Sequence, residues 1–120
     1  AKPDAGEMIV SPSEETKSFP HDAYANDEDL AKGIFNFEEV VNYSVKRITS
    51  SWAGLRTFAP DRTLVIGFDS VVPSFFWLAG QGGYGFQTSA AASKMASEII
   101  LGEKSSFGQL QKKVSPNRFK

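Results

Sequence analysis

FFWLAGQGGYGFQT, residues 75–88, is the stretch that decides the fold of this 120-residue sequence. Its continuous apolar run over 75–79 is typical of a strand buried on both faces. A glycine-rich turn follows, and residues 87–101 predict a helix that begins with small side chains and ends at Gly102, a favourable C-cap. The sequence therefore predicts a strand–glycine turn–helix unit over about residues 75–101.

The glycines of this turn are spaced as in a dinucleotide-binding fingerprint, G-x-G-x-x-G, at Gly80, Gly82 and Gly85. Glycine permits close backbone approach, and a helix N-terminus presents unpaired N–H groups. A complete βαβ unit also needs a second apolar strand ending in an acid, and residues 103–120 contain no such strand to deliver Glu103. Two interpretations stay open: glycines required by packing alone, or a backbone-lined site for an electron-rich ligand group, which we favour.

The segments before the turn predict one helix and several short strands. Residues 7–10 read as a strand after a turn-prone opening, and residues 11–25 as a loop that carries His21. A helix is expected over about 27–42, capped by Asn26, with one apolar face formed by Leu30, Ile34, Phe37 and Val41.

The second half continues with β-branched and aromatic residues. Residues 43–58 predict one or two strands, 59–62 a turn and 64–67 a further strand. Residues 103–120 are polar and basic, with Phe107 and Leu110 as candidate anchors. The predicted class is α+β, with a few mostly antiparallel strands, the amphipathic helix and the C-terminal strand–turn–helix unit.

Composition excludes several classes of chemistry. Cysteine is absent and His21 is the one histidine, which removes disulfide scaffolds, thiolate metal sites, cysteine nucleophiles and most histidine triads. No metal site is expected. No apolar run reaches the ~18 residues of a membrane span, so a cytoplasmic, reducing setting is expected. Residues 1–45 carry a net −7 and residues 46–120 a net +6, but the bases are scattered, so nucleic-acid binding is not expected.

Several blocks carry a family resemblance. They are WAGLR at 52–56 with Pro60-Asp61 and Val65-Ile66-Gly67, then GQGGYGFQT at 80–88, and SPNRF at 115–119. Their order and spacing resemble the C-terminal region of the glycine/D-amino-acid oxidase (DAO) family of FAD-dependent oxidoreductases. The resemblance covers about residues 45–120 well and residues 1–44 only loosely.

The resemblance implies a place for this chain in a larger two-domain flavoprotein. Residues 1–102 would be a C-terminal fragment, in which 1–58 end the substrate domain and 59–102 return to the FAD domain, followed by a tail over 103–120. The family's pyrophosphate-binding turn lies at the extreme N-terminus of its enzymes and is absent here. The isolated residues are therefore expected to be inactive and to lack bound FAD.

The same resemblance assigns roles to individual residues. Arg56 would hold the carboxylate of an amino-acid substrate, and Gln81 and Tyr84 would lie near the ring or the substrate. The flavin-binding positions would be Gly80, Gly82, Gly83, Tyr84, Gly85, Phe86, Gln87 and Thr88. The family's chemistry is hydride transfer from the substrate's α-carbon to the flavin, with no obligatory protein acid or base, so no catalytic residue is assigned.

Each assignment has a plainer alternative. Arg56 could be a surface arginine in an ion pair, and Gln81 and Tyr84 could only pack the turn. Trp52, Phe75, Phe76 and Trp77 are expected to be core strand residues rather than an aromatic substrate box, and Asp61 and Arg62 to form a local pair.

Two functions follow. The first is part of a FAD-dependent oxidoreductase, glycine oxidase-like or D-amino-acid oxidase-like, that acts on a small amine or amino acid. The alternative is a stand-alone, non-catalytic interaction module of the same fold, whose exposed Phe and Trp side chains bind a partner or form a homodimer.

Overall fold

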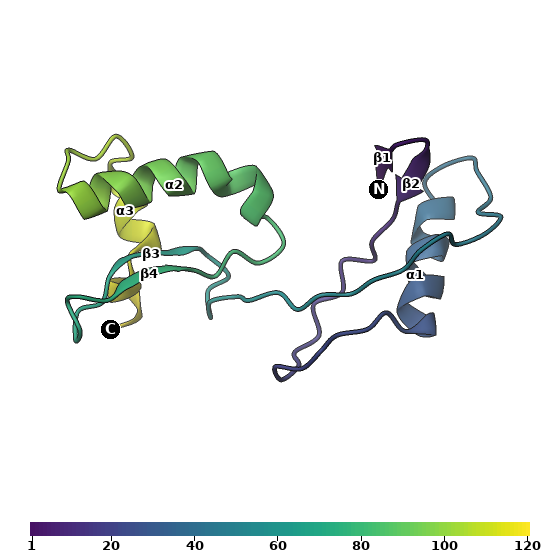
Figure 1. The fold of residues 1–120 in the computed structure, drawn as a ribbon, viewed down its shortest axis with the longest axis horizontal. Helices are drawn as coiled ribbons and strands as arrows, with labels where there is room; N and C mark the ends of the chain where they lie inside the picture. The colour runs from purple at the N-terminus through teal and green to yellow at the C-terminus, as the bar shows by residue number, and fades with distance from the viewer. The chain divides into compact units, whose positions relative to one another are not determined.

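The computed structural model describes residues 1–120, which form two compact units, Ala1–Leu55 and Arg56–Lys120 (Figure 1). Two antiparallel sheets of two strands each, three α-helices and a short 3₁₀ helix make up the regular structure. The predicted α+β class is confirmed.

The first unit begins with a β-hairpin. Strands β1 (Lys2–Asp4) and β2 (Glu7–Ile9) pair antiparallel, with Pro3 opposite Met8. Ala5 and Gly6, with φ of 46° and 84°, form the two-residue turn. The strand predicted over 7–10 is present, and the turn-prone opening at Lys2–Asp4 is itself a strand, because two consecutive residues with positive φ, Ala5 and Gly6, fold it back beside β2.

Helix α1 (Asp27–Glu38) follows the predicted capping pattern. The Asn26 side chain accepts a hydrogen bond from the Asp29 N–H at 2.8 Å, and three acids occupy the first turn. The helix ends four residues earlier than predicted. Val40 donates its N–H to the Phe37 carbonyl oxygen, three residues back, which tightens the last turn. Val41 lies beyond the helix and is 37% exposed, so its assignment to the buried face is wrong.

The strands predicted over residues 43–58 are absent. Side chains in this segment favour a strand only where a neighbouring strand supplies ladder hydrogen bonds and cross-strand contacts. No strand of either sheet pairs with this segment, which is joined to α1 by a hydrogen bond from the Val45 N–H to the Glu38 carboxylate at 2.6 Å.

The second unit is built on a hairpin of β3 (Val65–Phe68) and β4 (Phe76–Ala79). The strands pair antiparallel, with Val65 opposite Ala79 and Phe68 opposite Phe76. The Asp69 carboxylate organises the connecting loop, since it accepts hydrogen bonds from the indole N–H of Trp77 at 2.9 Å and the Val71 N–H at 2.7 Å. The Trp77 bond is the main reason that the pKa of Asp69 is lowered.

The prediction that β4 is buried on both faces is wrong. Trp77 and Leu78 are 37% and 50% exposed, and Phe76 is only partly buried. A continuous apolar run is buried on both faces when a sheet is covered on both sides. This sheet has two strands, and its packing within the unit leaves most of β4 open.

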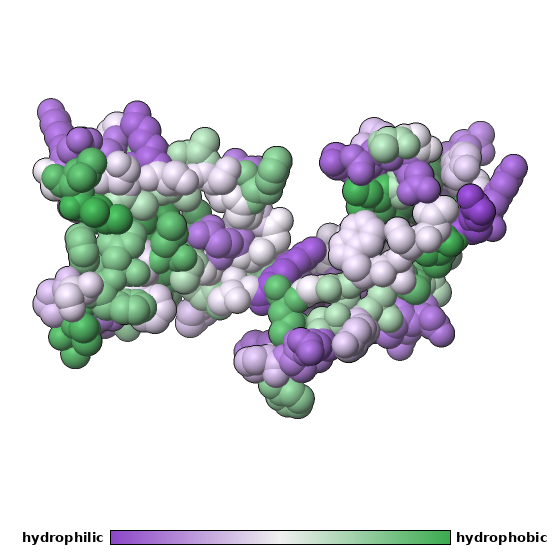
Figure 2. Space-filling model, in the orientation of Figure 1, coloured by the Kyte–Doolittle hydropathy of each residue, from purple (hydrophilic) through white to green (hydrophobic).

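Helix α2 (Gly85–Leu101) packs on β3, and Gly102 ends it in the left-handed conformation with φ 67°, as predicted. The helix begins two residues before the predicted start. The core of the unit contains Ile66, Ala92, Met95, Ala96 and Val114, with Leu64, Phe76, Ile99 and Phe107 against it. Figure 2 shows hydrophobic residues gathered where α2, α3 and the hairpin meet.

The C-terminal segment is more ordered than its composition indicates. Helix α3 (Gln109–Val114) and the 3₁₀ helix η1 (Pro116–Phe119) both pack on β3. Of the predicted anchors, Phe107 packs against the core, whereas Leu110 is 50% exposed and Val114 is buried in its place. A six-residue helix is too short to show an apolar period in the sequence.

A buried carboxylate fastens the loop after α2. Glu98 is 7% exposed and accepts hydrogen bonds from the Ser106 hydroxyl at 2.7 Å and the Ser106 N–H at 2.9 Å. These bonds lower the pKa of Glu98 below its ordinary value of 4.5. Its stabilising contribution is therefore complete above about pH 4.5 and is lost as pH falls through the lowered folded-state pKa.

We expect Glu98→Gln to lower the thermal unfolding temperature by several degrees at pH 7, because the amide can accept only one of the two bonds well. The difference from the wild type should begin to shrink below about pH 4.5, where Glu98 becomes protonated in the unfolded chain, and should shrink further as pH falls through the lowered folded-state pKa. Circular dichroism melts at pH 7 and pH 3 measure this, with the exposed Glu103→Gln as the matched control. A difference that is the same at both pH values would contradict the assignment.

Candidate functional site

The glycine turn lies between β4 and α2, as the sequence predicts. Gly80 and Gly82 adopt φ of 71° and 54°, a region that favours glycine. The Gly82 N–H donates to the Thr57 carbonyl oxygen at 2.9 Å, and the Tyr84 N–H donates to the Gln81 carbonyl oxygen at 3.2 Å. The turn is thereby fastened to the segment that enters the unit at Arg56.

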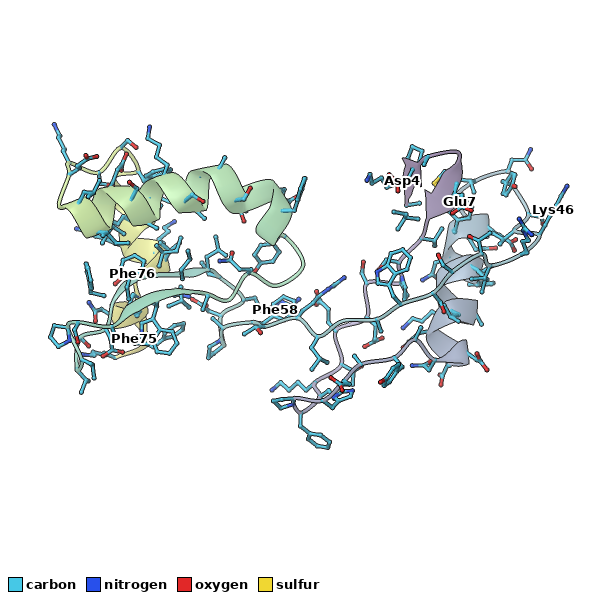
Figure 3. All side chains as sticks on the ribbon, in the orientation of Figure 1. Asp4, Glu7, Lys46, Phe58, Phe75 and Phe76 are labelled. Carbon is cyan, nitrogen blue, oxygen red and sulfur yellow. The ribbon has the colours of Figure 1, made fainter.

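The chain itself crowds Gly82, whereas Gly80 is only in ordinary contact with its neighbours. A Cβ atom on Gly82 would lie 2.6 Å from Cε1 of Phe58, and one on Gly80 would lie 3.4 Å from the Thr63 carbonyl oxygen. Figure 3 labels Phe58 at the start of the unit. Internal packing alone is thus sufficient to require glycine at residue 82. The spacing of glycines in the sequence therefore does not by itself demonstrate a ligand.

Arg56 lies against the turn. Its Nη1 atom is 3.1 Å from the place where a Cβ on Gly83 would be, so the guanidinium covers that glycine. Both residues are exposed. The structure therefore brings together the predicted carboxylate-binding arginine and the predicted flavin-binding turn, which lie 27 residues apart.

Gln81 and Tyr84 are both half-buried within the turn. The Gln81 Cβ lies 3.1 Å from the place of a Cβ on Gly85. The Tyr84 hydroxyl donates a hydrogen bond to the Arg62 carbonyl oxygen, and its ring meets the Phe58 ring edge-on, with centroids 6.4 Å apart. Both side chains pack the turn, and their contact with a substrate stays a prediction.

The N-terminus of α2 has no side-chain cap. Its first-turn amides, those of Gly85, Phe86 and Gln87, have no intrahelical acceptor, because the first such bond runs from the Thr88 N–H to the Tyr84 carbonyl oxygen. Phe86 is 99% exposed and Gln87 is exposed. A 17-residue helix thus presents its positive dipole end and free N–H groups, an arrangement that stabilises an oxygen carrying negative charge.

The aromatic side chains lie in different environments. The expectation of a core strand residue is met by Phe76, which packs on the core, but it is wrong for Trp52, which is 67% exposed in an irregular segment. It is also wrong for Phe75 and Trp77, which are 49% and 37% exposed and meet edge-on with centroids 4.9 Å apart. Figure 3 labels Phe75 and Phe76 beside each other on the hairpin.

The predicted local pair of Asp61 with Arg62 is corrected by the structure. Asp61 forms its ion pair with Arg118, 57 residues away, at 2.7 Å, and the Arg62 guanidinium lies 4.7 Å from the centroid of the Phe58 ring. A turn places Asp61 outward, where a distant arginine can reach it. His21 lies in an exposed loop, as predicted, with Nδ1 2.6 Å from the Phe19 carbonyl oxygen.

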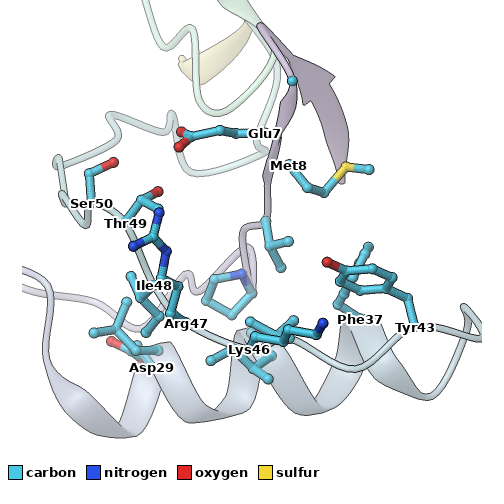
Figure 4. Close-up of a pocket in the computed structure, with 17 residues that line it drawn as sticks. Glu7, Met8, Asp29, Phe37, Tyr43, Lys46, Arg47, Ile48, Thr49 and Ser50 are labelled. Atoms are coloured by element: carbon cyan, nitrogen blue, oxygen red, sulfur yellow. The ribbon is translucent and has the colours of Figure 1, made fainter.

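The first unit contains a cavity of about 500 Å³. Figure 4 shows side chains around it from the β1–β2 hairpin, from α1 and from residues 43–50. None of the predicted site residues lines it. The sequence does not reveal this cavity, because the apolar face of α1 indicates a filled core, whereas only Gly33 and Phe37 of that helix are buried.

Metal ligation and helical membrane crossing find no support in the structure. No group of three or more His, Asp or Glu side chains is placed to hold a metal ion. None of the helices combines the length and the apolar character that crossing a bilayer requires.

A turn of positive-φ glycines opens an uncapped helix, with an arginine against it, and such an arrangement suits an oxygen-rich group. Comparison with protein families gives the class: a family model described as FAD dependent oxidoreductase (DAO) matches residues 1–99. The chain belongs to this family of FAD-dependent oxidoreductases. The match includes residues 1–44, where the resemblance of the sequence blocks is loose.

Proposed function

We propose that these residues act as the C-terminal part of a FAD-dependent oxidoreductase that oxidises a small amine or amino acid. The observation that carries the proposal is the position of Arg56, whose guanidinium lies against Gly83 in the turn that opens α2. The Arg56 cation, which could bind a carboxylate, and the first amides of α2, which could bind the polar edge of a ring, therefore lie at the same turn. The family match supports the FAD-dependent class.

The turn and the first turn of α2 would hold the flavin. The residues are those predicted from the sequence: Gly80, Gly82, Gly83, Tyr84, Gly85, Phe86, Gln87 and Thr88. Their fit rests on the uncapped amides of α2 and on the exposed side of Gly83. When bound, the flavin supplies a two-electron acceptor for the hydride of the substrate. Fixed amides close to the flavin would stabilise the negative charge that it gains on reduction.

Arg56 would bind and orient the substrate. A guanidinium is planar, stays charged and offers paired N–H donors that match the two oxygens of a carboxylate. In this proposal it fixes the amino acid so that its α-carbon faces the flavin. This chain then needs no catalytic acid or base, and its contribution is positioning and electrostatics.

The test uses the complete enzyme that contains these residues. We expect Arg56→Ala to raise the KM for an amino-acid substrate by roughly 10²-fold or more, because a charged hydrogen bond to a carboxylate contributes ~1.5–3 kcal/mol and a bidentate pair contributes two. Arg56→Lys should restore only part of the loss. Substrate-dependent bleaching of the flavin absorbance measures both values.

Two controls sharpen this test. An amine substrate without a carboxylate should be oxidised equally by the wild type and by Arg56→Ala. The second control is Arg47→Ala, in the first unit, which should leave the KM for both substrates unchanged. An unchanged KM for the amino acid in Arg56→Ala would remove Arg56 from the site. Tight FAD binding or amine oxidation by residues 1–120 alone would overturn the proposal that they form one part of the enzyme.

A second function, a non-catalytic interaction module, is favoured by one observation. The second unit exposes the apolar side chains of Phe75, Trp77 and Leu78 in and beside β4, and that of Phe86 at the start of α2. If they form a homodimer interface, the 120-residue chain should sediment as a dimer and Leu78→Asp should make it a monomer. A wild-type monomer at high concentration would exclude the homodimer.

A further inference from the structure

Arg118 in η1 uses every N–H group of its guanidinium. Its Nε donates to Oδ2 of Asp61 at 2.7 Å, and its Nη2 donates to Oδ1 of Asp61 at 3.0 Å and to the Thr63 carbonyl oxygen at 2.8 Å. Its Nη1 donates to the carbonyl oxygens of Val114 and Ser115 at 2.8 Å and 3.0 Å. The Arg118 side chain is 13% exposed. One residue thus joins the end of α3 to the turn at 59–63.

The turn at 59–63 in turn supports the glycine turn. A Cβ on Gly80 would lie 3.6 Å from the Cβ of Ala59 and 3.4 Å from the carbonyl oxygen of Thr63, which is the oxygen that Arg118 also binds. The Tyr84 hydroxyl donates to the carbonyl oxygen of Arg62, in the middle of the same turn. Residues 59–63 therefore lie between Arg118 on one side and both ends of the glycine turn on the other.

We infer that Arg118 is a positioning residue, which fixes the glycine turn through residues 59–63 and so sets the direction in which the first amides of α2 point. Only the purpose of those amides, binding the flavin, rests on the proposed function. Arg118 itself touches no part of the glycine turn and acts through Asp61 and Thr63.

Arginine is required at this position by geometry. The fork of Nε and Nη2 matches the two oxygens of Asp61, while Nη1 points the other way to the last carbonyl oxygens of α3. Lysine has the charge but a single nitrogen, so it cannot reach both groups at once. The ion pair lowers the pKa of Asp61 from 3.8 to about 2, mainly through the bonds from Arg118, so the contact is fully formed at neutral pH.

The experiment measures amide hydrogen exchange in the 120-residue chain by NMR. The reporters are the Gly82 and Tyr84 amides, which donate to the carbonyl oxygens of Thr57 and Gln81, and the reference is the buried Met95 in α2. We expect Arg118→Lys to speed exchange at both reporters by about tenfold while Met95 changes much less, since the turn opens locally. Asp61→Asn, a milder variant that keeps the shape of the turn, should also speed exchange at Gly82 and Tyr84 more than at Met95, but by a smaller factor. The exposed Lys120→Met is the control and should change nothing.

Two results would overturn the inference. One is unchanged exchange at Gly82 and Tyr84 in both variants. The other is an equal rise at Gly82, Tyr84 and Met95 in both variants, because that would make Arg118 a source of general stability only. The same variants in the flavin-loaded complete enzyme should shift the flavin's reduction potential. Local exchange changes without a shift in potential would count against the proposed function and leave the positioning role of Arg118 standing.

Discussion

Ile66→Ala should lower the free energy of unfolding of the second unit by about 2–5 kcal/mol, the usual cost of removing a buried aliphatic side chain. Ile66 is 1% exposed and lies in the middle of the core between β3, α2 and α3. The other buried side chains around it are few, so little material can move into the cavity that remains. Because the free energy of unfolding of a whole domain is only about 5–15 kcal/mol, this variant should approach complete unfolding.

Denaturant unfolding monitored by circular dichroism measures the change. Ile100→Ala is the matched control, because it makes the same chemical change on α2 at a residue that is 55% exposed. Its effect should stay within about 0.5 kcal/mol. Equal effects of the two substitutions would show that the core is not centred on Ile66.

Gly82→Ala is expected to disrupt the glycine turn. Its φ of 54° disfavours any residue with a side chain by roughly 1–2 kcal/mol. In addition, the new methyl group would lie 2.6 Å from Cε1 of Phe58 and 3.0 Å from Cε1 of Tyr84, so both rings must move. Overpacking of this kind costs about 1–3 kcal/mol more.

Gly102→Ala separates the cost of the left-handed backbone from the cost of crowding. Gly102 has a similar φ of 67°, but no atom lies within 4 Å of the place of its Cβ. Thermal unfolding should show a smaller loss for Gly102→Ala than for Gly82→Ala, and the difference is the cost of crowding. Equal losses would mean that the Phe58 ring can move aside freely.

The helices could be predicted from the sequence because their signals are local. Asn26 caps α1 through a residue three positions away, and Gly102 ends α2 through its own left-handed backbone. The strand–turn–helix order over residues 75–101 is equally local, since the apolar run, the glycines and the small residues follow one another directly.

The strands over residues 43–58 could not be predicted correctly, because strand formation depends on a partner that local composition does not specify. The same limit explains the pairing of Asp61 with Arg118, 57 residues apart. Sequence adjacency favoured Arg62, but a turn directs neighbouring side chains apart. The burial of β4 was also misjudged, since an apolar run does not show how many faces of a sheet are covered.

The candidate site was only partly accessible to sequence reasoning. The glycine spacing indicates a tight turn and a helix N-terminus, and the structure contains both. The roles of Arg56 and Gly83 came from the family resemblance, since no spacing rule connects these two residues, and the structure adds that the guanidinium lies against Gly83. The supporting role of residues 59–63 depends on backbone oxygens, which every sequence has and which no motif distinguishes.

The crowding of Gly82 by Phe58 has a consequence for how variants of such enzymes are understood. Loss of flavin after a glycine substitution is usually taken as the mark of direct contact between cofactor and backbone. Here the same loss would follow from displaced aromatic rings even if Gly82 made no contact with the flavin. Intolerance of substitution at this glycine therefore identifies a tightly packed corner of the protein, and the cofactor has to be located by other residues.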